Sequence, residues 1–116
     1  MYQRFGNASI RTDPPVALVD VSGECDIATT STLTGLFNTA VAEGCRDFRV
    51  DMNRVTFCDA SMIGLLVSLD RRLRADDGSL TILGTSECVQ RLLHIVGLDS
   101  LLRERADLGY TTASNG

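Results

Sequence analysis

The chain has 116 residues, a net charge of −4 and a pI of about 4.8, and 44% of its residues are apolar. This length and composition fit one globular domain with an ordinary core. The acidic balance argues against nucleic acid as a partner, because phosphate binding needs a basic surface. All 11 basic residues are arginine, which excludes chemistry that needs a lysine, such as a Schiff base or a P-loop.

No targeting or membrane segment is expected. The first nine residues, MYQRFGNAS, lack the apolar stretch of a secretory signal. No apolar run approaches the roughly 20 residues that span a bilayer. The four cysteines form no CxxC pair, and one histidine adds little to them, so we expect buried thiols in a reducing compartment. These features predict a cytoplasmic protein with no metal site, no cofactor and no direct membrane insertion.

The first half of the chain predicts two strands and a helix. Residues 5–10 are a weakly patterned edge strand, and residues 16–21 are apolar on both faces, as in a central strand. Residues 22–26 are polar and contain a glycine, which predicts a loop. A helix is expected from about Thr29 to Gly44, which has the residue type typical of a helix end. Its apolar stripe consists of Leu33, Leu36, Phe37, Ala40 and Val41.

The second half repeats this alternation. Residues 48–52 alternate as a strand, Asn53-Arg54 looks like a break, and an apolar path continues to Cys58. The next helix follows Asp59, and residues 80–84 form a further buried strand. A helix capped by Ser86 and closed by Gly97, a short helix within 98–105 and a flexible tail at 111–116 complete the expected elements.

Strands separated by helices predict a parallel arrangement, since parallel strands need crossover connections. We therefore expect an α/β fold in a single domain over residues 1–110, followed by the tail. The sheet should be mixed and mainly parallel, with about four strands packed against about four helices.

Asp59 and Ser61 interrupt an otherwise apolar run at the point where the strand pattern changes to a helix pattern. Functional groups in such sheets collect beyond the carboxyl ends of the strands. Asp59 is expected to cap the helix, and the Ser61 hydroxyl should be partly exposed in its first turn. The pair is fully explained as a helix cap. It also suits a phosphorylation switch, because a helix N-terminus tolerates a dianion while neighbouring Asp59 would be repelled by it.

Three stretches resemble the bacterial anti-sigma factor antagonist family, whose fold is the STAS domain. Residues 21–26, VSGECD, are similar to its (S/T)-G-E-(aliphatic)-D motif. Residues 50–66, which contain FCDAS, resemble its D-S-(S/T)-G block. Residues 81–98, which contain VQRLLHIVGL, are similar to its closing strand and helix. Together, in this order, they span most of residues 16–102.

The resemblance implies a partner-switching regulator and not an enzyme. Family members bind an anti-sigma factor that is also a serine kinase of the GHKL ATPase type, and thereby release a sigma factor. The kinase inactivates the antagonist by phosphorylating a serine, which matches Ser61 here, and a serine phosphatase restores it. The implied partner-binding residues are Glu24, Asp26, Asp59, Ala60, Ser61 and Met62. A monomer or a weak dimer is expected.

The chain departs from the family pattern at three positions. Cys25 replaces an aliphatic residue, which is a mild change at a buried position. Ala60 replaces a serine and leaves a single hydroxyl as the acceptor. Met62 stands where glycine is common, and a long side chain there is expected to narrow the access of a kinase to Ser61.

Other interpretations come from different classes of protein. STAS-like domains also serve as accessory subunits of membrane transporters and lipid-transport complexes. An aspartyl-phosphate receiver with Asp59 or Asp51 as acceptor is disfavoured by the lack of lysine, and an independent enzyme by the single histidine. The arginines Arg71, Arg72 and Arg74 suit a solvated helix end; a second interpretation makes them part of a docking site for an acidic partner.

Overall fold

A computed structural model describes residues 1–95 of the chain. Its elements in chain order are β1 (Tyr2–Phe5), β2 (Ala8–Asp13), β3 (Val16–Cys25), α1 (Ile27–Ala42), β4 (Asp47–Cys58), α2 (Ala60–Ala75), β5 (Ser79–Thr85) and α3 (Glu87–Ile95). Within these residues, no helix combines the length and the apolar character needed to cross a membrane.

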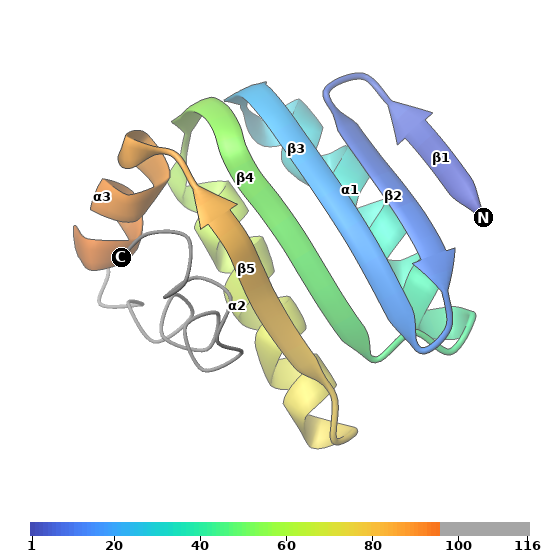
Figure 1. Ribbon diagram of the computed structural model, residues 1–116. Helices are drawn as coiled ribbons and strands as arrows, with labels where there is room; N and C mark the ends of the chain where they lie inside the picture. Colours follow the sequence, from blue (N-terminus) through green and yellow to red (C-terminus); the bar gives the residue numbers. More distant parts are fainter. Residues whose placement is uncertain (96–116) are drawn as a thin grey trace.

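The five strands form one sheet in the order β1-β2-β3-β4-β5 (Figure 1). β1, β2 and β3 are antiparallel neighbours, whereas β3, β4 and β5 run parallel. This confirms the expected mixed α/β sheet, with five strands where about four were expected and three helices in the described part. The helix expected within 98–105, the helix end at Gly97 and the tail at 111–116 lie outside the described residues.

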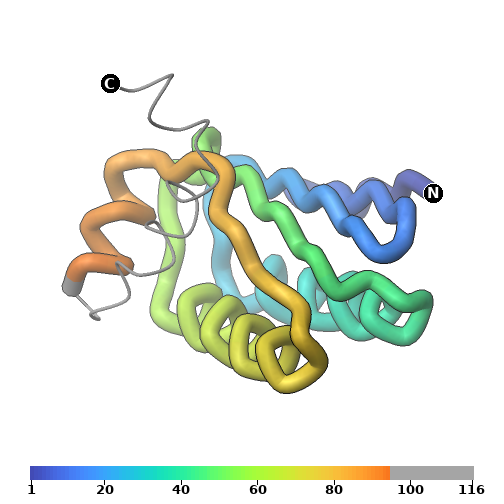
Figure 2. The backbone as a smooth tube through the Cα atoms, turned by 60° about the horizontal axis from the view of Figure 1, so that its bottom comes forward, coloured from blue at the N-terminus to red at the C-terminus, as the bar shows by residue number. Residues whose placement is uncertain are grey.

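α1 and α2 lie side by side against one face of the sheet (Figures 1 and 2). The main core fills the layer between them and the sheet, because each helix turns one apolar stripe toward the strands. Its largest fully buried side chains include Phe37 of α1, Leu66 and Leu73 of α2, and Phe48 and Ile82 of the sheet. The rings of Phe37 and Phe48 meet edge to face, with centroids 5.6 Å apart. α3 lies beside the carboxyl ends of β4 and β5.

The prediction of one edge strand over residues 5–10 is wrong. The segment contains a tight turn at Gly6-Asn7, which joins β1 and β2 in a hairpin. Gly6 has a φ of 58°, a left-handed conformation that glycine adopts without a steric penalty. The turn places a two-residue break inside what reads as a single run of strand residues.

The loop expected at residues 22–26 and the break expected at Asn53-Arg54 are also wrong. β3 continues to Cys25 and β4 continues to Cys58, so the two strands stay paired along their length. Their register shifts between Asp20 and Ser22 and again between Gly23 and Glu24. These irregularities are bulges, which accommodate polar residues and the positive φ of Gly23 without ending the strand.

The predicted helix boundaries agree closely with the structure. α1 begins at Ile27, two residues before the expected start, and its C-cap Glu43 is followed by Gly44 with a φ of 103°. α2 begins directly after Asp59, as the cap interpretation requires. Both helices of the parallel crossovers therefore begin at the same edge of the sheet, at the carboxyl ends of β3 and β4, where the candidate site lies.

Candidate functional site

The carboxyl ends of β3 and β4 place two aspartates at the same edge of the sheet. Cys25 and Cys58 are paired in register, and each is followed at once by the aspartate that caps the next helix. Asp26 accepts hydrogen bonds of 3.1 Å from the backbone N–H groups of Ala28 and Thr29. Asp59 accepts a bond of 3.0 Å from the backbone N–H of Ser61. The predicted cap at Asp59 is confirmed.

Ser61 is half-buried, and its hydroxyl belongs to a short chain of hydrogen bonds. The hydroxyl donates to Asp59 Oδ1, and Thr30 Oγ1 of α1 lies 3.0 Å from Ser61 Oγ. A hydroxyl has one proton to donate, so Thr30 is the donor in the second bond. This bond is shorter than the 3.3 Å contact between Thr30 Oγ1 and the carbonyl of Asp26. The Ser61 oxygen is thus held between two helix N-termini.

The hydrogen bonds to Asp59 also stabilise its charged form. The hydroxyl of Ser61 contributes most, followed by the nearby backbone N–H groups, and together they lower the pKa of the Asp59 carboxyl below its ordinary value. Asp59 is therefore ionised at neutral pH and is an acceptor, not a donor, toward Ser61. The ionised Asp59 therefore fixes which group donates in each hydrogen bond: Thr30 donates to Ser61, and Ser61 donates to Asp59.

The β1–β2 hairpin supports this edge of the sheet through Asn7. The Asn7 side-chain amide donates bonds of 2.7 and 2.9 Å to the carbonyls of Ser22 and Glu24. Its oxygen accepts from the hydroxyl of Thr29 at 3.3 Å. One amide thus ties the carboxyl end of β3 to the first turn of α1.

The predicted partner-binding residues lie together, with one exception. Glu24, Asp26 and Ala60 are exposed at this edge, next to half-buried Asp59 and Ser61. The side chain of Met62 is 0% exposed and packs into the core. It neither borders the surface nor narrows the access to Ser61, contrary to the expectation, because the helix turns residue 62 toward the sheet.

Two exposed apolar side chains near the site were not predicted. Ile27 is 72% exposed as the first residue of α1, and Phe57 is 53% exposed and paired in register with Glu24. Both side chains expose apolar area next to polar groups at this edge of the sheet. The sequence offered no signal for this, because a single apolar residue at a strand end or helix start does not reveal whether its side chain faces the core or solvent.

The thiols beneath the two caps are chemically quiet. Burial is the main cause that raises the pKa of Cys25 to about 11 and that of Cys58 to about 12. A thiol is reactive as its thiolate, so both remain protonated and weakly nucleophilic at neutral pH. The expectation of buried thiols holds for Cys25 and Cys45, whereas Cys58 and Cys88 are half-buried; all four are free.

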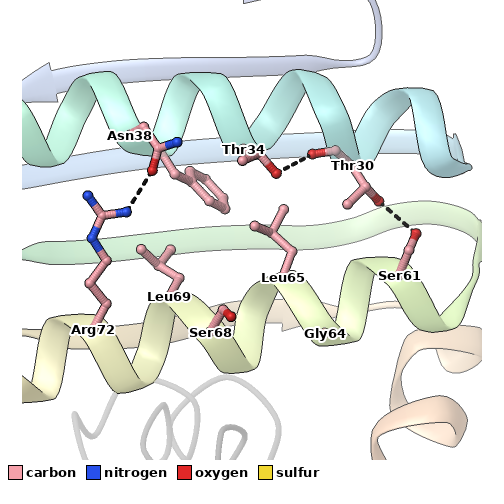
Figure 3. A pocket seen from close by; sticks show the side chains of 10 residues that line it. Thr30, Thr34, Asn38, Ser61, Gly64, Leu65, Ser68, Leu69 and Arg72 are labelled. Carbon is pink, nitrogen blue, oxygen red and sulfur yellow. Dashed lines mark hydrogen bonds between the residues drawn. The ribbon is translucent and has the colours of Figure 1, made fainter.

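A groove of about 460 Å³ runs between α1 and α2 and begins at Ser61 (Figure 3). Thr30 and Ser61 meet at one end, and Asn38 and Arg72 meet at the other. Leu65 and Leu69 point into the space between these two contacts. The candidate site therefore consists of the sheet edge around Ser61 and a groove that leads away from it.

Comparison with known proteins identifies the fold and the family. The model of the family described as "Mlab, STAS domain" matches residues 8–104. An anti-sigma-B factor antagonist of Staphylococcus aureus is 34% identical over 84 residues, which cover 72% of this chain and 78% of that protein.

Solved structures share the fold at lower identity. Unphosphorylated SpoIIAA, an anti-sigma factor antagonist, superposes with a TM-score of 0.73 at 21% identity, over 87% of this chain and 84% of that one. The phosphorylated form of the Bacillus SpoIIAA protein gives 0.69 at 19% identity, over 92% and 97% of the two chains. From its family match and its curated relatives, the chain belongs to the anti-sigma factor antagonist family of STAS domain proteins.

Proposed function

We propose that this chain binds an anti-sigma factor that is also a serine kinase of the GHKL ATPase type, and so releases a sigma factor. Phosphorylation of Ser61 switches the binding off, and a serine phosphatase restores it. The observation that carries the proposal is the half-buried Ser61 hydroxyl, oriented by Asp59 at the start of α2. The chain acts by binding and not as an enzyme, and its need for an ATP-dependent kinase is consistent with a cytoplasmic location.

The local electrostatics support a switch that leaves the fold intact. A phosphoryl group adds a charge of about −1.5 to −2, which the N-terminus of α2 favours. The same group removes the proton that Ser61 donates to Asp59 and sets a second negative charge beside that carboxylate. The repulsion acts at the surface and not in the core, because Met62 and Ile63, the next residues of α2, hold the helix to the sheet.

The surroundings of Ser61 suit a protein partner. Ile27 and Phe57 supply exposed apolar area, and Glu24 and Asp26 add negative charge beside it. Apolar anchors bordered by charges are typical of the residues that dominate binding energy at interfaces. A partner with apolar and basic side chains fits this surface, and a phosphoserine within it alters both charge and shape.

The relatives support this reading over the alternative of an accessory subunit of a transporter or lipid-transport complex. Curated relatives at 34% identity are named anti-sigma-B factor antagonists. SpoIIAA has been solved in unphosphorylated and phosphorylated forms, and this chain superposes on both. That pair supports a phosphorylation event that preserves the fold.

The decisive experiment incubates the full chain with each candidate anti-sigma factor kinase of the source organism and ATP, followed by mass spectrometry. We expect one phosphoryl group on Ser61. The Ser61→Ala variant should remain folded and unmodified, while Ser31→Ala, at an exposed position of α1, should be modified like the wild type. Undiminished phosphate incorporation in Ser61→Ala, mapped to another residue, contradicts the assignment.

A binding titration with two variants of Ser61 separates the effect of charge on affinity from the effect of side-chain size. Ser61→Glu should weaken kinase binding by at least tenfold, whereas the neutral Ser61→Gln should have a much smaller effect. Both variants should unfold at nearly the wild-type temperature, because residue 61 lies at a helix N-terminus outside the core. Equal losses of affinity in the two variants would show that bulk, and not charge, controls docking.

A further inference from the structure

The groove between α1 and α2 is bounded at both ends by hydrogen bonds between the helices. At the Ser61 end, Thr30 and Ser61 lie 3.0 Å apart, oxygen to oxygen. At the far end, Arg72 Nη1 donates a bond of 2.6 Å to Asn38 Oδ1 (Figure 3). The two contacts connect the helices at both ends of the groove.

The lining changes character along the groove. Hydroxyl groups of Thr30 and Ser61 lie at one end, the apolar side chains of Leu65 and Leu69 line the middle, and the guanidinium of Arg72 lies at the other end. The space beside Gly64, which also lines the groove, is open, since a Cβ atom built on it would meet no other atom within 4 Å. An apolar centre with polar groups at defined ends is the composition expected of a binding groove.

Arg72 is the single charged residue that lines the groove. Arg46, Arg54 and Arg74 pair with the carboxylates of Asp76, Asp20 and Asp70, respectively. Among the residues that the structure describes, Arg72 has no such ion pair, and its contact is with the neutral amide of Asn38. Arginine presents a planar set of donors suited to a carboxylate, so the charge of the groove is complementary to an acidic side chain.

We propose that this groove receives a segment of the partner anti-sigma factor that carries an apolar side chain and a carboxylate about 10 Å apart. The apolar side chain packs on the half-buried Leu65, and the carboxylate pairs with Arg72. Seven residues of helix separate Leu65 from Arg72, which corresponds to about 10 Å at 1.5 Å per residue. The inference rests on the proposed function and extends its docking surface along α2.

The geometry separates this contact from the phosphorylation switch. Arg72 lies 11 residues beyond Ser61 on α2, about 16 Å along the helix axis. This exceeds the distance over which exposed charges interact at physiological salt, which is about 8 Å. The Arg72 contact is therefore independent of the charge on Ser61, and the losses of affinity from changes at the two positions should multiply.

The test titrates the full chain with each candidate anti-sigma factor kinase of the source organism and compares four variants. Arg72→Glu reverses the charge of the groove, and Gly64→Leu fills its middle. The matched controls are Arg71→Glu, an exposed arginine on the same helix that does not line the groove, and Gly35→Leu, a helical glycine of α1 with open space around it that also lies outside the groove. Circular dichroism and thermal unfolding verify that all four variants fold.

We expect Arg72→Glu and Gly64→Leu to weaken kinase binding by at least tenfold, and each control to change it by less than about threefold. In all four variants, Ser61 should still be phosphorylated at saturating kinase. Wild-type affinity in both groove variants, or equal losses in the groove variants and their controls, overturns the groove inference and leaves the proposed function standing. If no candidate kinase binds or modifies the wild-type chain, the proposed function fails and the inference fails with it.

Discussion

α1 and α2 both begin with an aspartate N-cap, but they differ in the residue to which the cap is hydrogen-bonded. Each follows a cysteine that ends a parallel strand, and each starts with an aspartate whose side chain accepts a bond from the backbone two residues later. That second residue is Ala28 in α1 and Ser61 in α2. The hydroxyl of Ser61 takes a further bond to the cap, which Ala28 has no side-chain group to make.

In the first turn of α1, the hydroxyl of Thr29 faces inward instead. Thr29 is 7% exposed and contacts Asn7, Glu24 and Asp26. It joins structural elements, whereas the Ser61 hydroxyl stays half-buried at the surface between two helix starts. The comparison shows that an aspartate cap becomes a candidate switch only when a hydroxyl occupies the second residue after it.

Removal of each cap should distinguish the two helix starts. Asp26→Ala and Asp59→Ala should each lower the free energy of unfolding by about 1 kcal/mol, as measured by urea denaturation, because each leaves helix N–H groups without their acceptor. Only Asp59→Ala should also slow the phosphorylation of Ser61, by about tenfold or more, since the hydroxyl loses the carboxylate that orients it. Equal phosphorylation rates in the two variants would remove the functional distinction between the caps.

The thiols that precede the two caps should make the fold sensitive to alkali. The folded-state pKa values of about 11 for Cys25 and about 12 for Cys58 lie above the ordinary value of 9.0. The unfolded chain therefore loses these protons first, so stability is complete below pH 9 and declines as the pH rises through the folded values.

By pH 10 we expect a loss on the order of 1 kcal/mol for the pair, after allowance for solvent screening. Urea denaturation at pH 8 and pH 10 measures this loss, to which lysine makes no contribution because the chain has none. A Cys25→Ala, Cys58→Ala variant, compared at the same two pH values, should show a smaller decline. An unchanged decline in that variant would assign the effect to other groups.

The smallest expected effect concerns the charge of Asp59. Its folded pKa is lowered chiefly by the Ser61 hydroxyl, so its contribution to stability is present at neutral pH and is lost as the pH falls through the folded value. Ser61→Ala should raise the pKa of Asp59 toward its ordinary value. The loss of stability on acidification should then begin at a slightly higher pH. Carboxyl NMR titration measures the shift, with Ser31→Ala as the control; a pKa that stays low in Ser61→Ala would assign the shift to the backbone bonds alone.

The helices and the cap at Asp59 could be predicted because their signals are local. Leu33, Leu36 and Phe37 recur at helical spacing, and an aspartate precedes the first turn of α2. The errors at residues 22–26 and 53–54 have one physical cause: a bulge and a loop look alike in composition. Gly23 and Arg54 lie at bulges, where the pairing continues on both sides of an irregular step.

Only the site residues that belong to a sequence motif could be predicted. Asp59, Ser61, Glu24 and Asp26 belong to recognisable motifs, and the structure places them at one edge of the sheet. The contact of Thr30 with Ser61 and the groove that ends at Arg72 depend on how α1 lies against α2. The inward side chain of Met62 likewise follows from the rotation of the helix on the sheet, which single-residue patterns do not specify.

The amide of Asn7 has a practical consequence for work with this protein. Because it links the N-terminal hairpin to the end of β3 and the start of α1, a truncation that removes this hairpin also removes a support of the docking edge. Such a truncation should weaken partner binding although no partner-contacting residue is changed, so comparisons of binding strength should use identical N-terminal sequences.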